Sequence, residues 1–261
     1  QITDAAGSEY SVKNESDDSF FTRLFVSERK QIAVMAEEKL PSQISLRLFA
    51  INRSEVRITM KPISIRRIVE AVSGKLAWGD DNILVTSVII DSRKAGPGAL
   101  FVPIIGERVD AHRFIPDVLE AGAAVTFSSD PDVKYEKGAC IIVEDTLAAL
   151  QKLAAWYRSL FDIPVIGVTG SVGKTTTKEM IAAVLEKKYR TVKTIGNLNS
   201  QIGVSLMMFH LDNLTQMAVI EMGISMPGEM DHLVDIARPT VAVLTNVGVS
   251  HIGNLGSRGN I

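Results

Sequence analysis

A glycine-rich stretch that carries a lysine constrains this chain more than any other part of its sequence. The apolar run at 165–168 predicts a buried strand, a glycine-rich turn follows it, and the apolar spacing at 178–185 predicts a helix. Strand, turn and helix in this order form a cradle for phosphate, because backbone N–H groups and the positive helix end point toward the anion. In this turn Lys174 would reach the β- and γ-phosphates, and the Thr175 hydroxyl would ligate Mg²⁺.

The turn differs from the full Walker A pattern in its glycine spacing. The full pattern has an earlier glycine at the position where this chain has Val168. A glycine-rich turn with an incidental lysine is therefore the alternative interpretation. The flanking strand and helix favour a phosphate site, and the residues assigned to it are Gly170, Ser171, Val172, Gly173, Lys174, Thr175 and Thr176.

The composition is that of an ordinary globular chain of one or two domains. The chain has 261 residues, of which 46% are hydrophobic and 22% are charged. The net charge of −2 gives no electrostatic case for binding nucleic acid or an anionic membrane. A single cysteine, Cys140, excludes an internal disulfide and is predicted to be a buried strand residue. No apolar run is long enough to span a bilayer, so we expect no membrane insertion. The single cysteine fits a reducing cytoplasm, and we expect a monomer.

The pattern of strands and helices divides the chain into three parts. Residues 1–59 contain no recognisable site and are interpreted as a poorly ordered extension, because Met60 opens a stretch typical of a native start. The extension is either an accessory segment or upstream sequence carried in by a misplaced start. Residues 60–161 predict a small α/β domain, with Asp145 as the N-cap of its last helix, which is expected from 146 to about 160. Residues 162–261 predict a nucleotide-binding domain with a mostly parallel sheet.

Two polar clusters follow strands of the predicted first domain. Ser92 and Arg93 come after a strand predicted at 85–90, and a second cluster at 107–112 comes after a strand predicted at 99–102. Ligands of α/β sheets bind at the carboxyl ends of strands, and an arginine beside a hydroxyl suits an anionic substrate. A surface turn with local salt bridges explains the same residues, and composition alone favours that alternative.

Polar residues also follow strands in the second domain. Asn197 and Asn199 lie in an amide-rich loop predicted at 196–203, Glu221 ends a buried strand, and His251 follows another. A carboxylate at the end of an apolar strand is costly to desolvate alone, and Mg²⁺ beside the phosphate loop would neutralise it. The alternative is a solvated glutamate in a turn. His251 is expected at the same sheet edge, as a metal ligand, a phosphate contact or a turn residue.

Taken together, these stretches resemble the Mur ligase family. The matching pieces occur in the family's order, cover about residues 60–261, and lie at 91–93, 100–102, 106–114, 170–180, 196–199, 221–223, 246–248 and 251–258. A sister ligase of the family, which adds the third peptide residue, shares the pattern of the first domain. It usually has Thr-Asn in place of Ser171 and Val172, and Ser-Ser-His at 222–224.

The resemblance implies an ATP-dependent amide ligase of peptidoglycan precursor synthesis. Its substrates would be UDP-N-acetylmuramoyl-tripeptide and D-alanyl-D-alanine, and its cofactors would be ATP and Mg²⁺. The first domain would hold the UDP end, with Ser92 and Arg93 in the matching motif. ATP would phosphorylate the terminal carboxylate of the tripeptide, and the amine of D-alanyl-D-alanine would attack the resulting acyl phosphate.

The resemblance also implies a role for each residue of the second domain. The loop from Gly170 to Thr176 would wrap the ATP phosphates, and Asn197 and Asn199 would line the cleft between nucleotide and substrate. The metal ligands would be Thr175, Glu221 and His251, and the catalytic residues would be Lys174 and His251.

Two positions depart from the family's pattern. Ser200 stands where the family often has a second Asn, which would weaken an amide contact in the cleft. Gly259 stands where a Glu is common, which would alter a helix start. The chain also stops at Ile261, before the family's carbamylated lysine and third domain. We therefore expect that this polypeptide alone does not ligate.

Other classes of function remain compatible with the residues. One is another P-loop enzyme, such as a kinase or a folylpolyglutamate-type ligase, and another is a non-catalytic nucleotide-binding relative. The intact set Lys174, Thr175, Glu221 and His251 argues against a mere binder, which does not need a second metal ligand. A UDP-sugar binder should protect residues 91–115 from hydrogen exchange when UDP is added, which separates the ligase from the other enzymes.

Overall fold

The computed structural model describes residues 60–135, 137–248 and 252–256. Before residue 60 it describes only the backbone of three short strands, β1 (Ile2–Thr3), β2 (Glu9–Tyr10) and β3 (Arg23–Val26). Most of the expected extension at 1–59 therefore lies outside the described residues, and so do His251 and Gly259. The expectations for these residues stay predictions.

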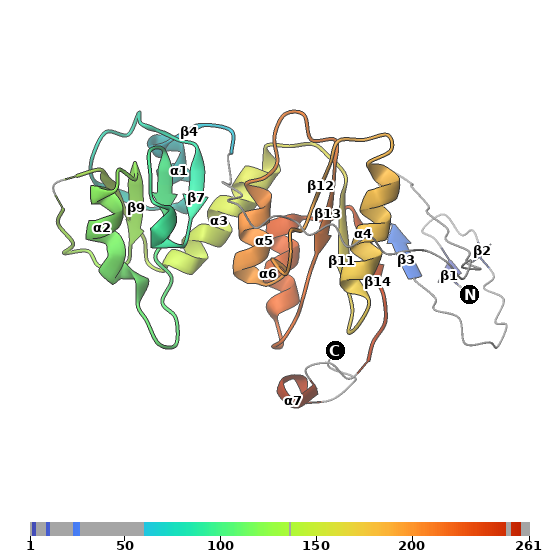
Figure 1. Ribbon diagram of the computed structural model, residues 1–261. Coiled ribbons are helices and arrows are strands. Elements are labelled where there is room, and N and C mark those ends of the chain that lie inside the picture. Colours follow the sequence, from blue (N-terminus) through green and yellow to red (C-terminus); the bar gives the residue numbers. More distant parts are fainter. Residues whose placement is uncertain are drawn as a thin grey trace.

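The first domain is built on a five-stranded sheet in the order β5, β10, β9, β8, β7 (Figure 1). All neighbouring strands are parallel except β5, which runs antiparallel to β10. Val88 and Leu100 belong to the large core that includes α1 and α3, whereas Ile89 and Phe101 belong to a separate core with α2. This alternation shows that both faces of the sheet are covered, as is typical of parallel strands. The elements are β4 (Ile63–Ser64), α1 (Ile65–Val72), β5 (Lys75–Trp78), β6 (Leu84–Val85), β7 (Ser87–Ile89), β8 (Ala99–Phe101), α2 (Ile115–Glu120), β9 (Val125–Ser128), β10 (Ala139–Ile142) and α3 (Thr146–Ser159).

Most of these elements agree with the sequence patterns. Asp145 caps α3 as predicted, because its carboxylate accepts a hydrogen bond of 2.6 Å from the Ala148 N–H. Cys140 is fully buried in β10, and burial raises the pKa of its thiol to about 12. The prediction of a single strand at 85–90 was wrong. The chain forms two strands there, β6 and β7, because it pairs with β4 before Thr86 and with β8 after it.

The second domain has a sheet in the order β12, β13, β11, β14, β3. Its first four strands are mutually parallel, which confirms the predicted topology, and only β3 at the edge is antiparallel. Helix α4 covers one face of the sheet, while α5 and α6 cover the other together with α3 (Figure 1). The elements are β11 (Val165–Thr169), α4 (Lys174–Leu185), β12 (Thr191–Lys193), α5 (Gln201–Met208), β13 (Met217–Glu221), α6 (Glu229–Ala237), β14 (Val241–Leu244) and α7 (Ile252–Leu255).

Helix α3 connects the two sheets and packs against elements of both. Its side chains Leu150, Leu153 and Tyr157 are fully buried in one core that contains residues of α1, of the first sheet, and of α5 and α6. The Tyr157 hydroxyl donates to the Leu211 carbonyl at 2.8 Å and accepts from the Lys61 N–H at 2.9 Å. The predicted boundary after residue 161 follows α3 in sequence, but the hydrophobic core extends across it.

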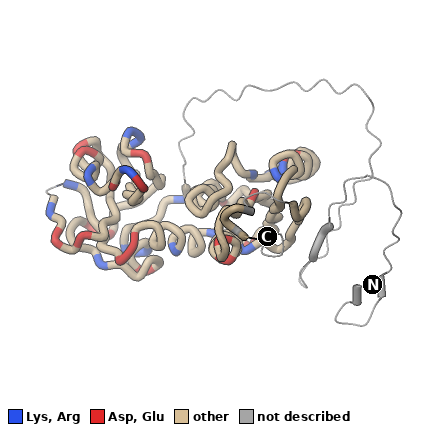
Figure 2. Tube along the Cα trace, turned by 90° about the horizontal axis from the view of Figure 1, so that it is seen from below, with Lys and Arg blue, Asp and Glu red and all other residues tan. Residues whose placement is uncertain are grey.

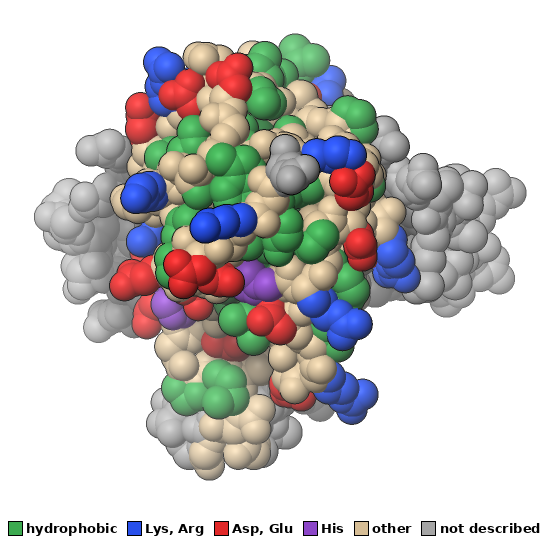
Figure 3. All heavy atoms as spheres, turned by 90° about the vertical axis from the view of Figure 1, so that its left-hand side faces the viewer, with side chains coloured by type: hydrophobic (Ala, Val, Ile, Leu, Met, Phe, Trp, Pro, Cys, Tyr) green, Lys and Arg blue, Asp and Glu red, His purple; other side chains and the backbone are tan. Residues whose placement is uncertain are grey.

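The surface carries charges of both signs. Acidic and basic residues are interspersed along the described trace of both domains (Figure 2). The end of the molecule formed by the first domain likewise shows charged side chains of both signs among apolar ones (Figure 3). Within the described part of the chain, no helix has the length and apolarity needed to cross a bilayer.

Candidate nucleotide and metal site

The glycine loop between β11 and α4 is shaped by a close contact with the chain after β14. Gly170 has φ +131°, and a Cβ there would overlap the Thr245 hydroxyl and lie 2.9 Å from the Asn246 carbonyl oxygen. Asn246 also accepts two loop N–H groups: that of Ser171 on its carbonyl at 3.1 Å and that of Val172 on its side-chain oxygen at 3.0 Å. Sequence reasoning did not assign Thr245 or Asn246 to the site, although their place after a buried strand is the usual signal.

The loop leads into α4 in the way that a phosphate site requires. Gly173 adopts φ +82° and opens the helix without a side-chain cap, so the first N–H groups of α4 point toward the loop without a capping partner. The Lys174 ammonium folds over the loop and donates to the carbonyl of Gly170 at 2.7 Å and that of Ser171 at 3.4 Å. The predicted loop residues therefore form a positively polarised cradle at the carboxyl end of β11.

Glu221 lies beside this cradle at the end of β13, and it is 2% exposed. Its carboxylate accepts from the Thr175 hydroxyl at 2.9 Å and from the Asn199 side-chain amide at 2.8 Å. Both donors are neutral, and no ion pair among the described residues involves Glu221. The alternative of a solvated glutamate in a turn is therefore wrong.

The surroundings of Glu221 fit a divalent cation. A buried carboxylate with neutral partners lacks charge compensation, which a cation between Glu221 and the Thr175 hydroxyl would supply. The described residues contain no group of three His, Cys, Asp or Glu side chains that could hold a metal ion. The single buried carboxylate is compatible with Mg²⁺, which is commonly bound through one or two carboxylates together with waters and substrate phosphates.

The amide-rich loop approaches Glu221 from the other side. The side-chain amide of Asn199 points at Glu221, while the main-chain carbonyl of Asn199 accepts from the Gly223 N–H at 2.9 Å. Asn197 shapes the same turn by accepting the Asn199 N–H at 2.8 Å. Ser200 is the N-cap of α5, which begins at Gln201, so the loop predicted at 196–203 was wrong in its last three residues. The expected loss of an amide contact at Ser200 stays a prediction.

Ser92 and Arg93 lie in a different place, in the first domain. They belong to a short 3₁₀ turn after β7, and the Arg93 guanidinium pairs with Asp91 at 2.7 Å while its side chain is 87% exposed. This ion pair lowers the pKa of Asp91 to about 2. A surface turn with a local salt bridge is thus what the structure shows, and the hydrogen bonds that Arg93 makes to described residues do not link it to the phosphate loop.

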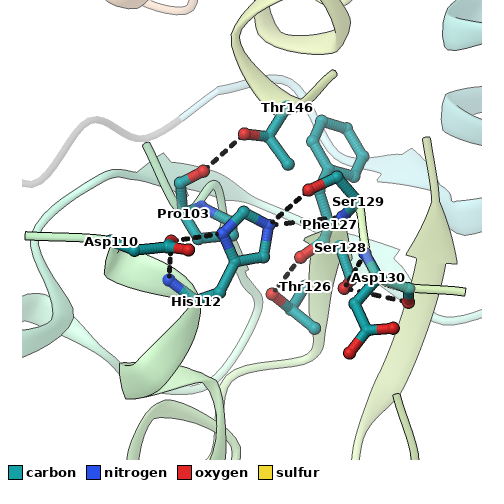
Figure 4. Close-up of polar contacts among 9 residues, drawn as sticks. All are labelled: Pro103, Asp110, His112, Thr126, Phe127, Ser128, Ser129, Asp130 and Thr146. Carbon is teal, nitrogen blue, oxygen red and sulfur yellow. Dashed lines mark hydrogen bonds and ion pairs between the residues drawn. The ribbon is translucent and has the colours of Figure 1, made fainter. Parts of the chain in front are cut away.

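The polar cluster predicted at 107–112 takes part in a chain of polar contacts in the first domain that the sequence did not reveal (Figure 4). Asp110 accepts from the His112 backbone N–H at 2.9 Å and lies 2.6 Å from Nδ1 of His112. Nε2 of His112 accepts the Ser129 N–H at 3.2 Å and lies 3.1 Å from the Ser129 hydroxyl. The order of side chains is that of a hydrolase triad, but the backbone amide already engages Nε2, so these contacts tie the loop before α2 to the end of β9.

Both domains match sequence models of one protein family. Residues 84–158 match "Mur ligase family, catalytic domain", and residues 168–261 match "Mur ligase middle domain". Together these matches contain the Glu221 site and the turn with Ser92 and Arg93.

Individual relatives agree with these matches. The chain is 46% identical over 200 residues to a "UDP-N-acetylmuramoyl-tripeptide–D-alanyl-D-alanine ligase" of Bacillus subtilis, covering 76% of this chain and 44% of the relative. A crystal structure of MurF from Acinetobacter baumannii superimposes with a TM-score of 0.74 at 35% identity, covering 77% of this chain and 45% of that one. MurF ligase from Thermotoga maritima, solved in complex with ADP, gives a TM-score of 0.60 at 34% identity, covering 66% and 40%. The chain spans less than half the length of these relatives. The chain therefore belongs to the Mur ligase family, and within it resembles the MurF ligases.

Proposed function

We propose that this chain forms the nucleotide-binding part of an ATP-dependent ligase that joins D-alanyl-D-alanine to UDP-N-acetylmuramoyl-tripeptide in the cytoplasm. The names of its relatives support the choice of substrates, and the relative solved with ADP supports the nucleotide. The observation that carries the proposal is the buried Glu221 carboxylate, which Thr175 and Asn199 hold beside the glycine loop.

The residues of the loop have separable roles in this proposal. The uncapped N–H groups of α4 and the Lys174 ammonium would bind the ATP phosphates and offset the repulsion between γ-phosphate and substrate carboxylate. Thr175 and Glu221 would hold one Mg²⁺, and His251 is proposed as a ligand of a second. Bound Mg²⁺ would supply charge neutralisation at the transferring phosphoryl group.

The chemistry would proceed in two balanced steps. An oxygen of the tripeptide carboxylate attacks the γ-phosphorus, the bond to the β-phosphate oxygen breaks, and ADP leaves an acyl phosphate behind. The amine of D-alanyl-D-alanine then attacks the acyl carbon, loses its proton, and releases inorganic phosphate as the amide forms. Ser92 and Arg93 would contact the UDP end of the first substrate, for which Arg93 would exchange its contact with Asp91.

The nucleotide part of the proposal can be tested on this chain alone. Isothermal titration of ADP should show binding that Mg²⁺ strengthens and that Lys174→Ala abolishes, because the Lys174 ammonium lies on the loop that would bind the phosphates. Lys187→Ala, at an exposed turn after α4, is the matched control and should bind as the unaltered chain does. Absence of ADP binding by the unaltered chain with Mg²⁺ would contradict the proposal.

The substrate part needs a different readout. Hydrogen exchange with added UDP should slow at residues 91–115 in the first domain, whereas a kinase or a folylpolyglutamate-type ligase would show no such protection. We also expect no release of ADP that depends on both substrates, because the chain spans less than half of its relatives. Such turnover by this chain would overturn that expectation.

A further inference from the structure

Lys178 is a buried cation that the proposed chemistry does not use. It lies on α4 one turn after Thr175, and only 1% of it is exposed. Its ammonium donates to the Thr194 carbonyl at 2.9 Å and pairs with Glu179 at 2.9 Å. Lysine side chains near a helix surface usually extend their ammonium into water, because burying the charge is costly. Burial of this ammonium against the Thr194 carbonyl, with one half-exposed carboxylate beside it, therefore calls for a reason.

Thr194 connects Lys178 to the candidate metal ligand. It directly follows β12 and is itself 1% exposed. Glu221 pairs with Val168 of β11 on one edge of β13, but on the other edge the pairing with β12 ends at Lys193 and Val219. The Thr194 hydroxyl then accepts the Glu221 N–H at 2.8 Å. Thr194 thus holds the main chain of Glu221 with its hydroxyl, while the Thr194 carbonyl accepts a hydrogen bond from Lys178.

Helix α4 consequently reaches Glu221 by two routes. Thr175 donates directly to the Glu221 carboxylate, and Lys178 acts on the Glu221 main chain through Thr194. Side chain and backbone of the same residue are therefore both held by the helix whose first turn faces the phosphate loop. An outer contact of this kind orients a metal ligand without touching the metal.

Charges at the surface balance the buried ammonium. Glu179 is bridged by Lys178 at 2.9 Å and by Lys193 at 2.8 Å, and Lys193 also lies 3.3 Å from Glu186. Glu179 is half exposed, so its pairs are screened by solvent and contribute modestly. The contact with the Thr194 carbonyl, in contrast, is fully buried, and it is the one that points toward Glu221.

We propose that Lys178 is a positioning residue for Glu221, which it aligns for metal binding through Thr194. The inference rests on the proposed function of the site, since Glu221 must bind the metal of the nucleotide complex. Lys178 itself would contact neither metal nor phosphate. Removal of the Lys178 ammonium should therefore lower the affinity for the metal and leave the affinity for metal-free nucleotide unchanged.

Mn²⁺ bound in the presence of ADP, measured by electron paramagnetic resonance, tests this directly. Lys178→Met keeps the length of the side chain but removes its charge and donors, and should lower Mn²⁺ affinity by about tenfold or more. Thr194→Val, which has nearly the same shape, should produce the same loss by removing the acceptor of the Glu221 N–H. Lys178→Arg should restore most of the affinity, and Lys187→Met is the matched control with an exposed lysine.

Three outcomes would count against the proposal in different ways. Normal Mn²⁺ binding by folded Lys178→Met, or by Thr194→Val if the first variant fails to fold, overturns the positioning role alone. An equal loss of ADP affinity in EDTA and with Mn²⁺ also overturns it, because Lys178 would then act on the loop or the fold. No Mn²⁺ binding by the unaltered chain with ADP overturns the proposed function and this inference together.

Discussion

At the scale of single residues, Glu221 offers the sharpest test of the site. Glu221→Gln keeps the shape and can still pair with Thr175 and Asn199, but it removes the buried negative charge. We expect the affinity for Mg²⁺ in the ADP complex to fall by more than about tenfold, or about 1.4 kcal/mol. The free energy of unfolding should stay within about 1 kcal/mol or rise, because a buried charge without a cationic partner is lost.

The measurements for this variant are Mg²⁺ titration of ADP binding and urea unfolding. Glu144→Gln is a matched control, because Glu144 is exposed and lies in the first domain. If Glu221→Gln bound Mg²⁺ with unchanged affinity, Glu221 would be a structural carboxylate and the metal would lie elsewhere.

Gly170 provides a second test at this scale, because its geometry excludes any side chain. In Gly170→Ala the new Cβ would overlap the Thr245 hydroxyl and crowd the Asn246 carbonyl, at a φ that L residues rarely adopt. We expect the free energy of unfolding in urea to fall by about 2–3 kcal/mol, the range of strained backbone positions. Gly122→Ala isolates the contribution of φ, since Gly122 has φ +93° with no atom within 4 Å of the added Cβ. Equal losses in both variants would show that the contact with Thr245 and Asn246 is unimportant.

The sequence located the residues whose chemistry is local and missed those whose role depends on the tertiary structure. Lys174 and Thr175 follow from the order of strand, turn and helix, and Glu221 follows from its place at a strand end. Thr194 and Asn246 escaped, because their contacts depend on which strands lie beside β11 and β13 in the sheet. That order cannot be obtained from periodicity along one chain.

At the scale of elements, the predicted boundaries were wrong where a change of strand-pairing partner or a helix cap determines the boundary. The single strand predicted at 85–90 hides the change of pairing partner at Thr86. The amide-rich loop hides the start of α5, because Ser200 supplies a cap of the kind that also occurs in turns. Elements with strong apolar periodicity and a clear N-cap, such as α3, were predicted nearly to the residue.

The 3₁₀ turn at Ser92–Lys94 should show a pH-dependent stability that comes from Asp91. Hydrogen bonds from Arg93 lower the pKa of Asp91 from 3.8 to about 2 in the folded chain. Because the folded pKa is the lower one, the stabilisation is complete above the unfolded value and is lost as the pH falls from about 4 toward 2. Arg93→Ala should thus cost at most about 1 kcal/mol near pH 6, since the pair is exposed to solvent.

The same variant should differ less and less from the unaltered chain as the pH approaches 2. Urea unfolding at several pH values measures this, with Arg108→Ala as a control at another exposed arginine of the first domain. A difference that stayed constant between pH 6 and 2 would mean that Arg93 acts on the turn by some means other than the Asp91 carboxylate.

At the scale of the whole molecule, we expect α3 to make the two domains one folding unit. Its buried side chains share a core with α1 and with α5 and α6, so neither sheet can lose its cover without exposing the helix. Unfolding followed by tryptophan fluorescence and by circular dichroism should therefore give coincident transitions. Trp78 and Trp156 report on β5 and α3, whereas circular dichroism reports on both domains.

Removing the Tyr157 hydroxyl tests this coupling between the domains, because that hydroxyl joins the start of the first domain to the second domain. Tyr157→Phe leaves the Lys61 N–H and the buried Leu211 carbonyl without this partner, and should lower the free energy of unfolding by about 1–3 kcal/mol. Tyr189→Phe is the matched control, since no hydrogen bond of the Tyr189 hydroxyl is found among the described residues, and should change stability by less than about 0.5 kcal/mol. If the hydroxyl serves both domains, the midpoints from fluorescence and circular dichroism should move together. A shift confined to the fluorescence transition would show instead that the first domain unfolds on its own and that α3 leaves the second domain with it.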